Sequence, residues 1–241
     1  MTAFRPPRSA AGDLLHVYLE GDGTPWTGAG VPAADPTPHD PLMLRLIGLD
    51  PAPSLYLARP CYDRHREDPG CAPDLWTDRR YGPVVVGALD QALRAFAAAH
   101  GYRGVVLLGH SGGGTLAMLL AARLPGVRAV VTIAANADID LWADQHDYPR
   151  LAGSLNPVRD GPARVPEWHW LGGQDRQVPA QQMFPVLARR SCARVNVAAD
   201  FDHRCCWESL WPRVLRELSH LSNTAMVAGH SNSPCPSREH R

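Results

Sequence analysis

The sequence predicts an α/β fold in which helices cover both faces of a mostly parallel sheet, giving three layers. Apolar runs of strand length alternate with helical patterns along the chain, and this alternation is typical of βαβ crossovers. The 241 residues are 45% hydrophobic, enough for a sizeable core. We expect one domain over 13–221, a flexible or truncated segment at 1–12 and a flexible tail at 222–241.

Short apolar runs bounded by turn residues are the predicted strands. They cover 14–19, 55–58, 104–108, 127–134, 167–171 and 193–199. Helices are predicted where apolar residues recur every three or four positions. These cover 41–49, 84–100, 113–124, 180–190 and 205–218. The remaining segment, 136–161, is irregular and polar-aromatic, so we expect only a short cap there.

The composition excludes several chemistries. All 24 basic residues are Arg, so no lysine can form a Schiff base with a carbonyl substrate or with pyridoxal phosphate. A Walker-A lysine and a kinase ion-pair lysine are absent for the same reason. The 24 acidic residues balance the basic ones, which argues against a nucleic-acid partner, since that usually needs a basic face.

No apolar run approaches the ~18 residues of a membrane span, and Met1–Gly12 lacks the apolar core of a secretory signal. We therefore expect no membrane span. The expected location is the cytoplasm for the sequence as written, or the periplasm or exterior if the N-terminus is truncated.

Six cysteines are present, and their spacing excludes a zinc finger because no C-x-x-C pair occurs. Cys61 and Cys71 flank a short loop. They are either bridged, which implies an oxidising compartment, or reduced and buried. A bond between the adjacent Cys205 and Cys206 is expected to be strained.

A serine nucleophile is predicted directly after the third strand. Residues 109–114 are GHSGGG, and a helical pattern follows, which is G-x-S-x-G in the strand–turn–helix setting of a nucleophile elbow. The turn is so sharp that side chains at Gly109 and Gly113 would collide with neighbouring backbone. Ser111 lies at its tip, in a strained conformation. The N-terminus of the next helix favours a developing anion, and the N–H of Gly112 is expected to donate to an oxyanion.

His203 is the predicted general base. It follows the last strand, and the carboxyl ends of parallel strands meet at the edge where ligands bind. The alternative is a loop histidine held for structural reasons. His110 is too close to Ser111 along a tight turn to orient as the base, so we expect it to pack the elbow. His169, between two tryptophans in a predicted strand, is expected to be structural.

Asp175 is the predicted acid, because it follows the strand 167–171 and completes a Ser…Asp…His order. A carboxylate there would hold the imidazole tautomer and stabilise the imidazolium. The alternative role is the N-cap of the next helix. The competing acids either follow the preceding strand or lie beside the base: Asp138, Asp140 and Asp202.

A second oxyanion donor is expected from the loop after the first strand. We predict the N–H of Asp22, since the neighbouring glycines permit close backbone approach. An acid pair or metal site at Glu20 and Asp22 is the alternative, but no accompanying ligand cluster is evident, so no metal is predicted. The residues expected to contact substrate lie on this loop, the elbow and the cap: Gly21, Gly23, His110 and Trp142.

The elbow, Asp175 and His203 together resemble the α/β-hydrolase family, over roughly 14–218. Four stretches are similar to a group of bacterial α/β-hydrolases of uncharacterised function. They are HVYLEGDG at 16–23, LARPC at 57–61, GHSGGG at 109–114 and DHRCCW at 202–207. The resemblance implies an eight-stranded sheet and serine hydrolase chemistry, usually without a cofactor. Since only about a dozen residues precede the first confident strand, the family's first two strands are expected to be largely missing or to begin upstream.

The predicted function is hydrolysis of a small-molecule carboxylic ester or thioester through an acyl-enzyme on Ser111, without a cofactor. An acyltransferase or a peptidase on the same triad is an alternative within enzymes. A non-catalytic binding member of the fold is the alternative outside them. The acyl group, the alcohol, and the choice between monomer and homodimer do not follow from the sequence.

Overall fold

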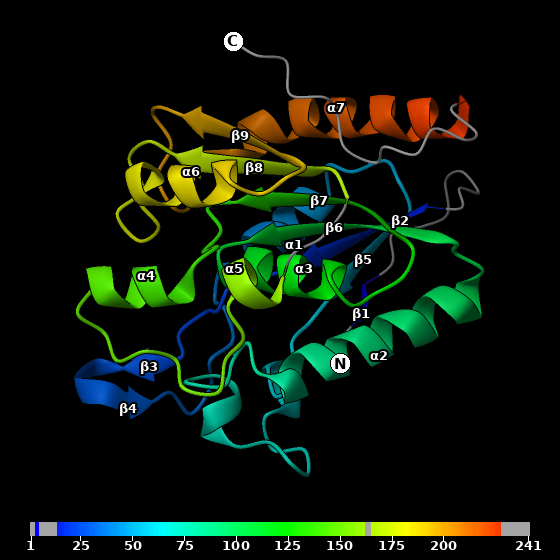
Figure 1. The fold of residues 1–241 in the computed structure, drawn as a ribbon. Coiled ribbons are helices and arrows are strands. Elements are labelled where there is room, and N and C mark those ends of the chain that lie inside the picture. Colours follow the sequence, from blue (N-terminus) through cyan, green and yellow to red (C-terminus); the bar gives the residue numbers. More distant parts are fainter. Residues whose placement is uncertain (1–2, 5–13, 162–164, 228–241) are drawn as a thin grey trace.

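The computed structural model describes residues 3–4, 14–161 and 165–227. It has three layers, with helices on both faces of a central sheet (Figure 1). The predicted fold class is therefore confirmed.

Within the described residues the main sheet has seven strands, in the order β1-β5-β2-β6-β7-β8-β9. All neighbours are parallel except β1, which pairs antiparallel with β5 at the edge. The expected eighth strand is not among them, because only the two-residue β1 precedes β2 in the described part of the chain. The bounds are β1 Ala3–Phe4, β2 Leu14–Leu19, β5 Ser54–Leu57, β6 Gly104–His110, β7 Val127–Ile133, β8 Glu167–Gly172 and β9 Ala193–Ala198.

The core consists of two hydrophobic clusters on opposite faces of the sheet. Leu107 packs with α2, α3 and α6, whereas its neighbour Leu108 packs with α1 and α7, because successive side chains of a strand point to opposite faces. Trp207 and Trp211 pack α7 against the same face of the sheet as Leu108, and each is only 1% exposed. The helices are α1 Leu42–Ile47, α2 Pro83–His100, α3 Gly112–Ala121, α6 Ala180–Ala188 and α7 Trp207–Val227.

The segment 136–161 is more regular than expected, since it contains α4 (Ile139–Gln145) and α5 (Pro157–Asp160). Asp138 accepts hydrogen bonds from two N–H groups of α4, and Asn156 accepts one from α5. Such caps stabilise helix ends regardless of the apolar period, which is why periodicity missed them. The segment is nevertheless a short cap, as predicted.

Smaller elements complete the chain. β3 (Trp26–Thr27) and β4 (Val31–Pro32) form a separate antiparallel pair, and three short 3-10 helices lie in loops of the described part of the chain. They are η1 Gly28–Gly30, η2 Asp63–His65 and η3 Pro73–Leu75.

α7 continues to Val227, past its expected end and into the segment expected to be a flexible tail. The rest of that tail, 228–241, lies outside the described residues. The expected flexible segment 1–12 does too, except for β1.

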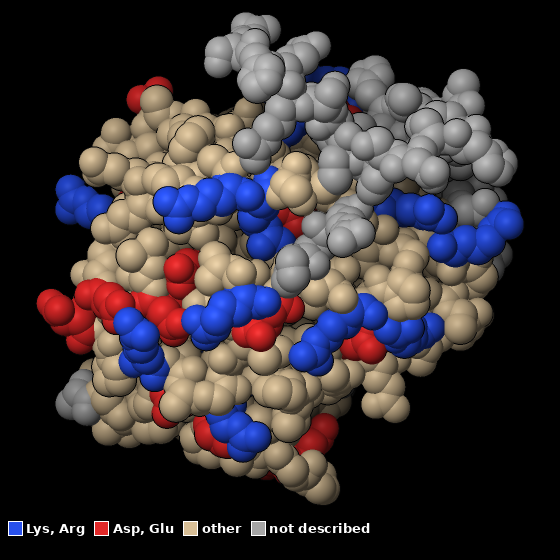
Figure 2. Space-filling model, viewed as in Figure 1, with Lys and Arg blue, Asp and Glu red and all other residues tan. Residues whose placement is uncertain are grey.

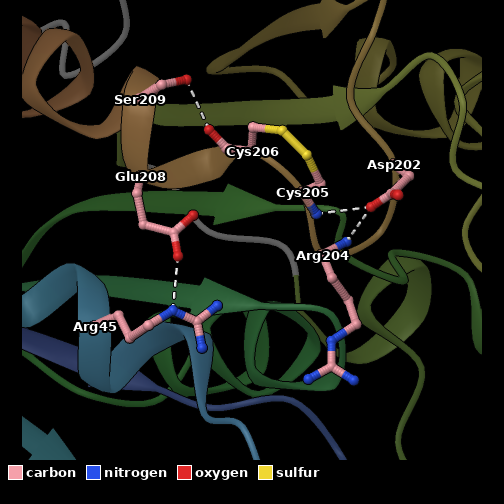
Figure 3. The surroundings of a disulfide bond; sticks show 7 residues. All are labelled: Arg45, Asp202, Arg204, Cys205, Cys206, Glu208 and Ser209. Carbon is pink, nitrogen blue, oxygen red and sulfur yellow. Dashed lines mark hydrogen bonds and ion pairs between the residues drawn. A yellow bond between two sulfur atoms is a disulfide. The ribbon is translucent and has the colours of Figure 1, made fainter.

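Two disulfides join described residues. Cys61 and Cys71 are bridged with their Cα atoms 5.5 Å apart, so the bridged alternative applies to this pair. Cys205 and Cys206, for which the sequence predicted only that a bond would be strained, are also linked (Figure 3). The peptide bond between them is cis, which brings their Cα atoms to 3.1 Å.

The loop around this second disulfide is held on both sides. Asp202 accepts hydrogen bonds from the N–H groups of Arg204 and Cys205, and the Ser209 hydroxyl donates to the Cys206 carbonyl (Figure 3). The loop therefore has a defined shape where it follows β9.

On the face shown in Figure 2, acidic and basic side chains lie next to one another. Ion pairs among the described residues include Arg94–Asp90 and Arg150–Asp144. Among the helices that the structure describes, none is long and apolar enough to cross a membrane.

Candidate active site

The turn between β6 and α3 has the predicted geometry of an elbow. Ser111 has φ 51° and ψ −124°, a region that a residue with a side chain occupies only when its surroundings enforce it. A Cβ at Gly113 would overlap the Leu19 carbonyl oxygen, and one at Gly109 would overlap the Gly113 backbone. Both positions therefore require glycine, and Ser111 projects from the end of the strand.

The structure brings Ser111, His203 and Asp175 together. The Ser111 hydroxyl oxygen lies 3.0 Å from His203 Nε2, and His203 Nδ1 lies 2.8 Å from Asp175 Oδ2. The second carboxylate oxygen of Asp175 accepts hydrogen bonds of 2.8 Å from the N–H groups of Gln177 and Val178. Asp175 thus stabilises its own turn with one oxygen and holds His203 with the other.

The competing acids have structural partners instead. Asp138 caps α4 and accepts a hydrogen bond from Asn156. Asp140 is paired with Arg159 at 2.6 Å, and Asp202 stabilises the turn after β9. None of these carboxylates is hydrogen-bonded to a histidine among the described residues.

His169 is fully buried, as expected of a structural histidine. Its ring nitrogens lie 2.8 Å from the Thr132 hydroxyl and 3.1 Å from a Glu167 carboxylate oxygen. Burial lowers the pKa of His169 below its ordinary value of 6.5, although Glu167 opposes the shift. His169 is therefore a neutral core residue.

His110 does more than pack the elbow. Its Nε2 lies 2.8 Å from the backbone carbonyl oxygen of His203, so Nε2–H donates. Its other ring nitrogen lies 3.6 Å from Glu20. The Glu20 carboxylate in turn accepts hydrogen bonds from the N–H groups of Gly21 and Met43. His110 Nδ1 has no hydrogen-bond partner among the described residues, so the bond to the loop after β9 is the one that His110 makes through its ring.

The loop after β2 lies against the nucleophile. A Cβ at Gly21 would be 3.4 Å from the Ser111 Cβ. The N–H groups of Asp22 and Gly112, the predicted oxyanion donors, donate no hydrogen bond to any described residue. Gly23 has φ 67°, and a Cβ there would overlap the Pro36 carbonyl oxygen, so it shapes the loop.

The sequence predicted a role for the N–H of Asp22 but did not predict the partners of its carboxylate. Its Oδ1 accepts a 2.5 Å hydrogen bond from Arg59, and its Oδ2 accepts one from the Tyr81 hydroxyl. Burial opposes ionisation, but Arg59 and Arg80 hold the pKa of Asp22 below its usual range. A Cβ at Gly112 would overlap this carboxylate, so Asp22 covers the residue that follows Ser111.

Trp142, expected to contact substrate, is 9% exposed. Its indole N–H donates a 2.9 Å hydrogen bond to the Gln177 carbonyl, which joins the cap to the turn that carries Asp175. The guanidinium of Arg80 lies over the Trp142 ring, 5.7 Å from its centre.

A hollow of about 430 Å³ adjoins Gly21. Its walls come from the loop after β2, from α1 and from the end of β5, and include Glu20, Gly21, Pro41, Leu44, Arg59 and Tyr62. In the described part of the chain, no group of three His, Cys, Asp or Glu side chains is arranged to hold a metal ion.

Of the residues around the Asp22 side chain, only Arg59 has a signal in the sequence. Arg59 belongs to the LARPC stretch that follows β5, at the sheet edge where ligands bind. Arg80 and Tyr81 belong to TDRRYG, which follows a loop rather than a strand. Only the folded chain brings these two segments together.

Comparison with known proteins identifies the family. The model of the alpha/beta hydrolase fold family matches residues 69–205, more than half of the chain. The chain therefore belongs to the α/β-hydrolase family. A search of curated proteins finds no match.

Solved structures agree in fold. A Pyrococcus furiosus esterase is 10% identical with a TM-score of 0.63, over 89% of this chain and 82% of that one. An α/β-hydrolase enzyme from a lagoon-sediment metagenome is 16% identical with a TM-score of 0.56, over 93% and 95%. A puromycin hydrolase is 16% identical with a TM-score of 0.59, over 91% of this chain but only 35% of its own length. The chain thus spans about a third of that hydrolase, and likeness at these identities shows the fold alone.

Proposed function

We propose that this protein is a serine hydrolase that cleaves carboxylic esters or thioesters through an acyl-enzyme. The observation that carries the proposal is the chain from Ser111 through His203 to Asp175, with distances of 3.0 and 2.8 Å. A serine hydroxyl is a weak nucleophile without an adjacent base, and these distances are within the reach that proton transfer requires.

In the first step, the Ser111 oxygen attacks the carbonyl carbon while its proton passes to His203 Nε2. The carbonyl oxygen becomes an oxyanion, which the N–H groups of Gly112 and Asp22 stabilise. Asp175 accepts the Nδ1–H hydrogen bond and stabilises the imidazolium. Neither N–H group has another hydrogen-bond partner among the described residues, which supports this assignment.

The bond to the leaving group then breaks, and His203 Nε2 returns its proton to the departing oxygen or sulfur. This leaves an acyl group on Ser111. In the second half, His203 takes a proton from a water molecule whose oxygen attacks the acyl carbon. The bond between the acyl carbon and the Ser111 oxygen then breaks, and His203 Nε2 gives its proton to that oxygen, which releases the carboxylic acid and restores the Ser111 hydroxyl.

Labelling with a serine-reactive fluorophosphonate tests the proposal. We expect one adduct, on Ser111, and none in Ser111→Ala. The exposed Ser191 provides a matched control, since Ser191→Ala should label like the wild type. Absence of label in folded protein, or an adduct elsewhere, would contradict the proposal.

A series of p-nitrophenyl esters of graded chain length then defines the acyl preference. Hydrolysis should disappear in Ser111→Ala at every chain length. Adding alcohol or amine acceptors separates hydrolysis from acyl transfer, because a transferase would form the new ester or amide faster than the free acid.

A further inference from the structure

Arg80 is a buried guanidinium that donates no hydrogen bond to any described residue. It is 4% exposed. Its closest charged neighbour is Asp22, with Nε 3.4 Å from Oδ2 and no hydrogen bond formed. Arginine carries five N–H donors, and a buried charge is costly unless it is paired and hydrogen-bonded. Arg80 therefore has donors available for a further partner.

The charges around Arg80 do not balance. Asp22 is the only described carboxylate within 4 Å of either Arg59 or Arg80, and both of its oxygens already accept hydrogen bonds. Burial raises the pKa of Tyr62 to about 12 and raises that of Tyr81 as well, so neither phenol contributes a negative charge near neutral pH. One positive charge remains in excess.

Accessibility distinguishes the two arginines. Nε and Nη1 of Arg59 are sealed from solvent and have no partner. In Arg80 only Nε is sealed from solvent, whereas Nη1 and Nη2 retain contact with solvent and also have no hydrogen-bond partner in the part of the chain that the structure describes. The N–H groups on Nη1 and Nη2 of Arg80 can therefore donate hydrogen bonds to a ligand.

Asp22 connects Arg80 to the proposed nucleophile. Arg80 contacts Asp22, whose carboxylate covers the Cα of Gly112, next to Ser111. The Arg80 guanidinium lies 5.6 Å from the centre of the Tyr81 ring and 5.7 Å from that of Trp142. Aromatic faces hold a guanidinium plane in a fixed orientation, so the donors are positioned before any ligand arrives.

We propose that Arg80 binds a carboxylate on the substrate, and that the preferred substrate is an ester or thioester carrying such an anionic group. A planar carboxylate matches two N–H groups on one edge of a guanidinium. It would also neutralise the excess charge. This inference rests on the proposed hydrolase function and specifies its substrate class.

Arylboronic acids test the inference, because boron forms a tetrahedral adduct with a nucleophilic serine. The probes are 3- and 4-carboxyphenylboronic acid, each compared with its neutral carboxamide analogue of nearly the same shape. We expect one carboxylate to bind the wild type about 10- to 100-fold more tightly than its amide, in line with a charge-assisted hydrogen-bonded pair. Raising the ionic strength should reduce the difference.

Variants of two neighbouring arginines test whether Arg80 causes the preference for the carboxylate over the amide. In Arg80→Gln, the preference should disappear while the amide binds as in the wild type. Arg79→Gln is the matched control: Arg79 is adjacent and half-exposed, pairs with Asp74 and gives the same change in net charge. It should keep the full preference. If Arg80→Gln fails to fold, Arg80→Lys retains the charge without the planar edge, and it should lose part of the preference.

Each outcome decides between the proposals. Equal binding of carboxylate and amide by the wild type, at both ring positions, overturns the anionic subsite and leaves the hydrolase intact. Equal weakening of both probes in Arg80→Gln also overturns it, since Arg80 would then act on the tetrahedral oxyanion. If no boronate binds and fluorophosphonate does not label Ser111, the hydrolase proposal itself fails.

Discussion

His110 donates a 2.8 Å hydrogen bond from Nε2 to the backbone carbonyl of His203. His110 is the last residue of β6, immediately before Ser111, whereas His203 follows β9. The bond therefore ties the proposed base to the strand that carries the proposed nucleophile. It holds the backbone of His203, while Asp175 holds the ring.

Replacing His110 by Ala should lower kcat about 10- to 100-fold with little change in KM, because small displacements of a catalytic group are costly. His110→Gln, whose amide can still donate to the carbonyl, should recover part of the loss. Steady-state kinetics on a p-nitrophenyl ester measures both. Identical values for the Ala and Gln variants would show that the hydrogen bond does not position His203.

Asp175→Asn separates the two roles of this side chain. The amide oxygen can keep the hydrogen bonds to the Gln177 and Val178 N–H groups, so the melting temperature should change little. The amide N–H₂ would face His203 Nδ1 and favour the wrong tautomer, so kcat should fall on the order of 10³- to 10⁴-fold.

The matched control for Asp175→Asn is Asp200→Asn, since Asp200 is exposed and also follows a strand of the sheet. It should leave both kcat and the melting temperature unchanged. A normal kcat in Asp175→Asn would remove Asp175 from the proposed triad. A large loss of thermal stability with normal kcat would assign it to the turn alone.

Two Gly→Ala changes should shift stability in opposite directions. At Gly113 the new Cβ meets the Leu19 carbonyl, so overpacking should destabilise the protein by about 1–3 kcal/mol or more. Gly87 lies within α2 with open space around its Cα, so Ala should stabilise by about 1 kcal/mol. Urea unfolding measures both, and a stable Gly113→Ala protein would contradict the steric explanation of the elbow.

Much of the fold could be predicted because local pattern and burial agree. β6 is buried along its whole length and β7 is buried except at Arg128. The glycines of the elbow follow from sterics within a few residues. The helix α4 was not predicted, because its start is defined by a single cap residue, Asp138, and not by an apolar period. For Cys205 and Cys206 the sequence predicted only that a bond would be strained, and it carries no signal for the cis peptide bond between them, since most peptide bonds are trans.

The proposed triad could be predicted for a topological reason. Ser111, Asp175 and His203 each follow a strand of one parallel sheet, and those strand ends converge at one edge. The cluster around Asp22 could not, because Arg80 comes from a loop before α2 and reaches the site only through tertiary packing. Hydrophobic periodicity predicts helices and strands, but it does not predict which carboxylate a long arginine side chain will contact.

The disulfide between Cys61 and Cys71 should stabilise the chain by about 3 kcal/mol, since it closes a loop of ten residues' separation in the unfolded state. The double variant C61A/C71A should therefore melt roughly 6–12 °C lower. Calorimetry measures this shift. An unchanged melting temperature would mean that the bridge contributes nothing to stability, and that the loop carrying Arg59 is fixed by packing alone.

Stability should decrease as the pH falls below 6.5, and His169 should account for part of the decrease. Burial lowers the pKa of His169 in the folded state below its ordinary value of 6.5, so below that pH the unfolded chain binds more protons. The free energy of unfolding then falls with decreasing pH, by at most about 1.4 kcal/mol per pH unit from this one group, until the pH reaches the folded-state pKa.

His169→Gln should flatten the profile between pH 6.5 and about 5, above the range where carboxylates titrate. His39→Gln, at an exposed histidine, should keep the wild-type slope. Urea unfolding at several pH values measures the three profiles, and equal slopes in the wild type and His169→Gln would show that His169 is not the group responsible.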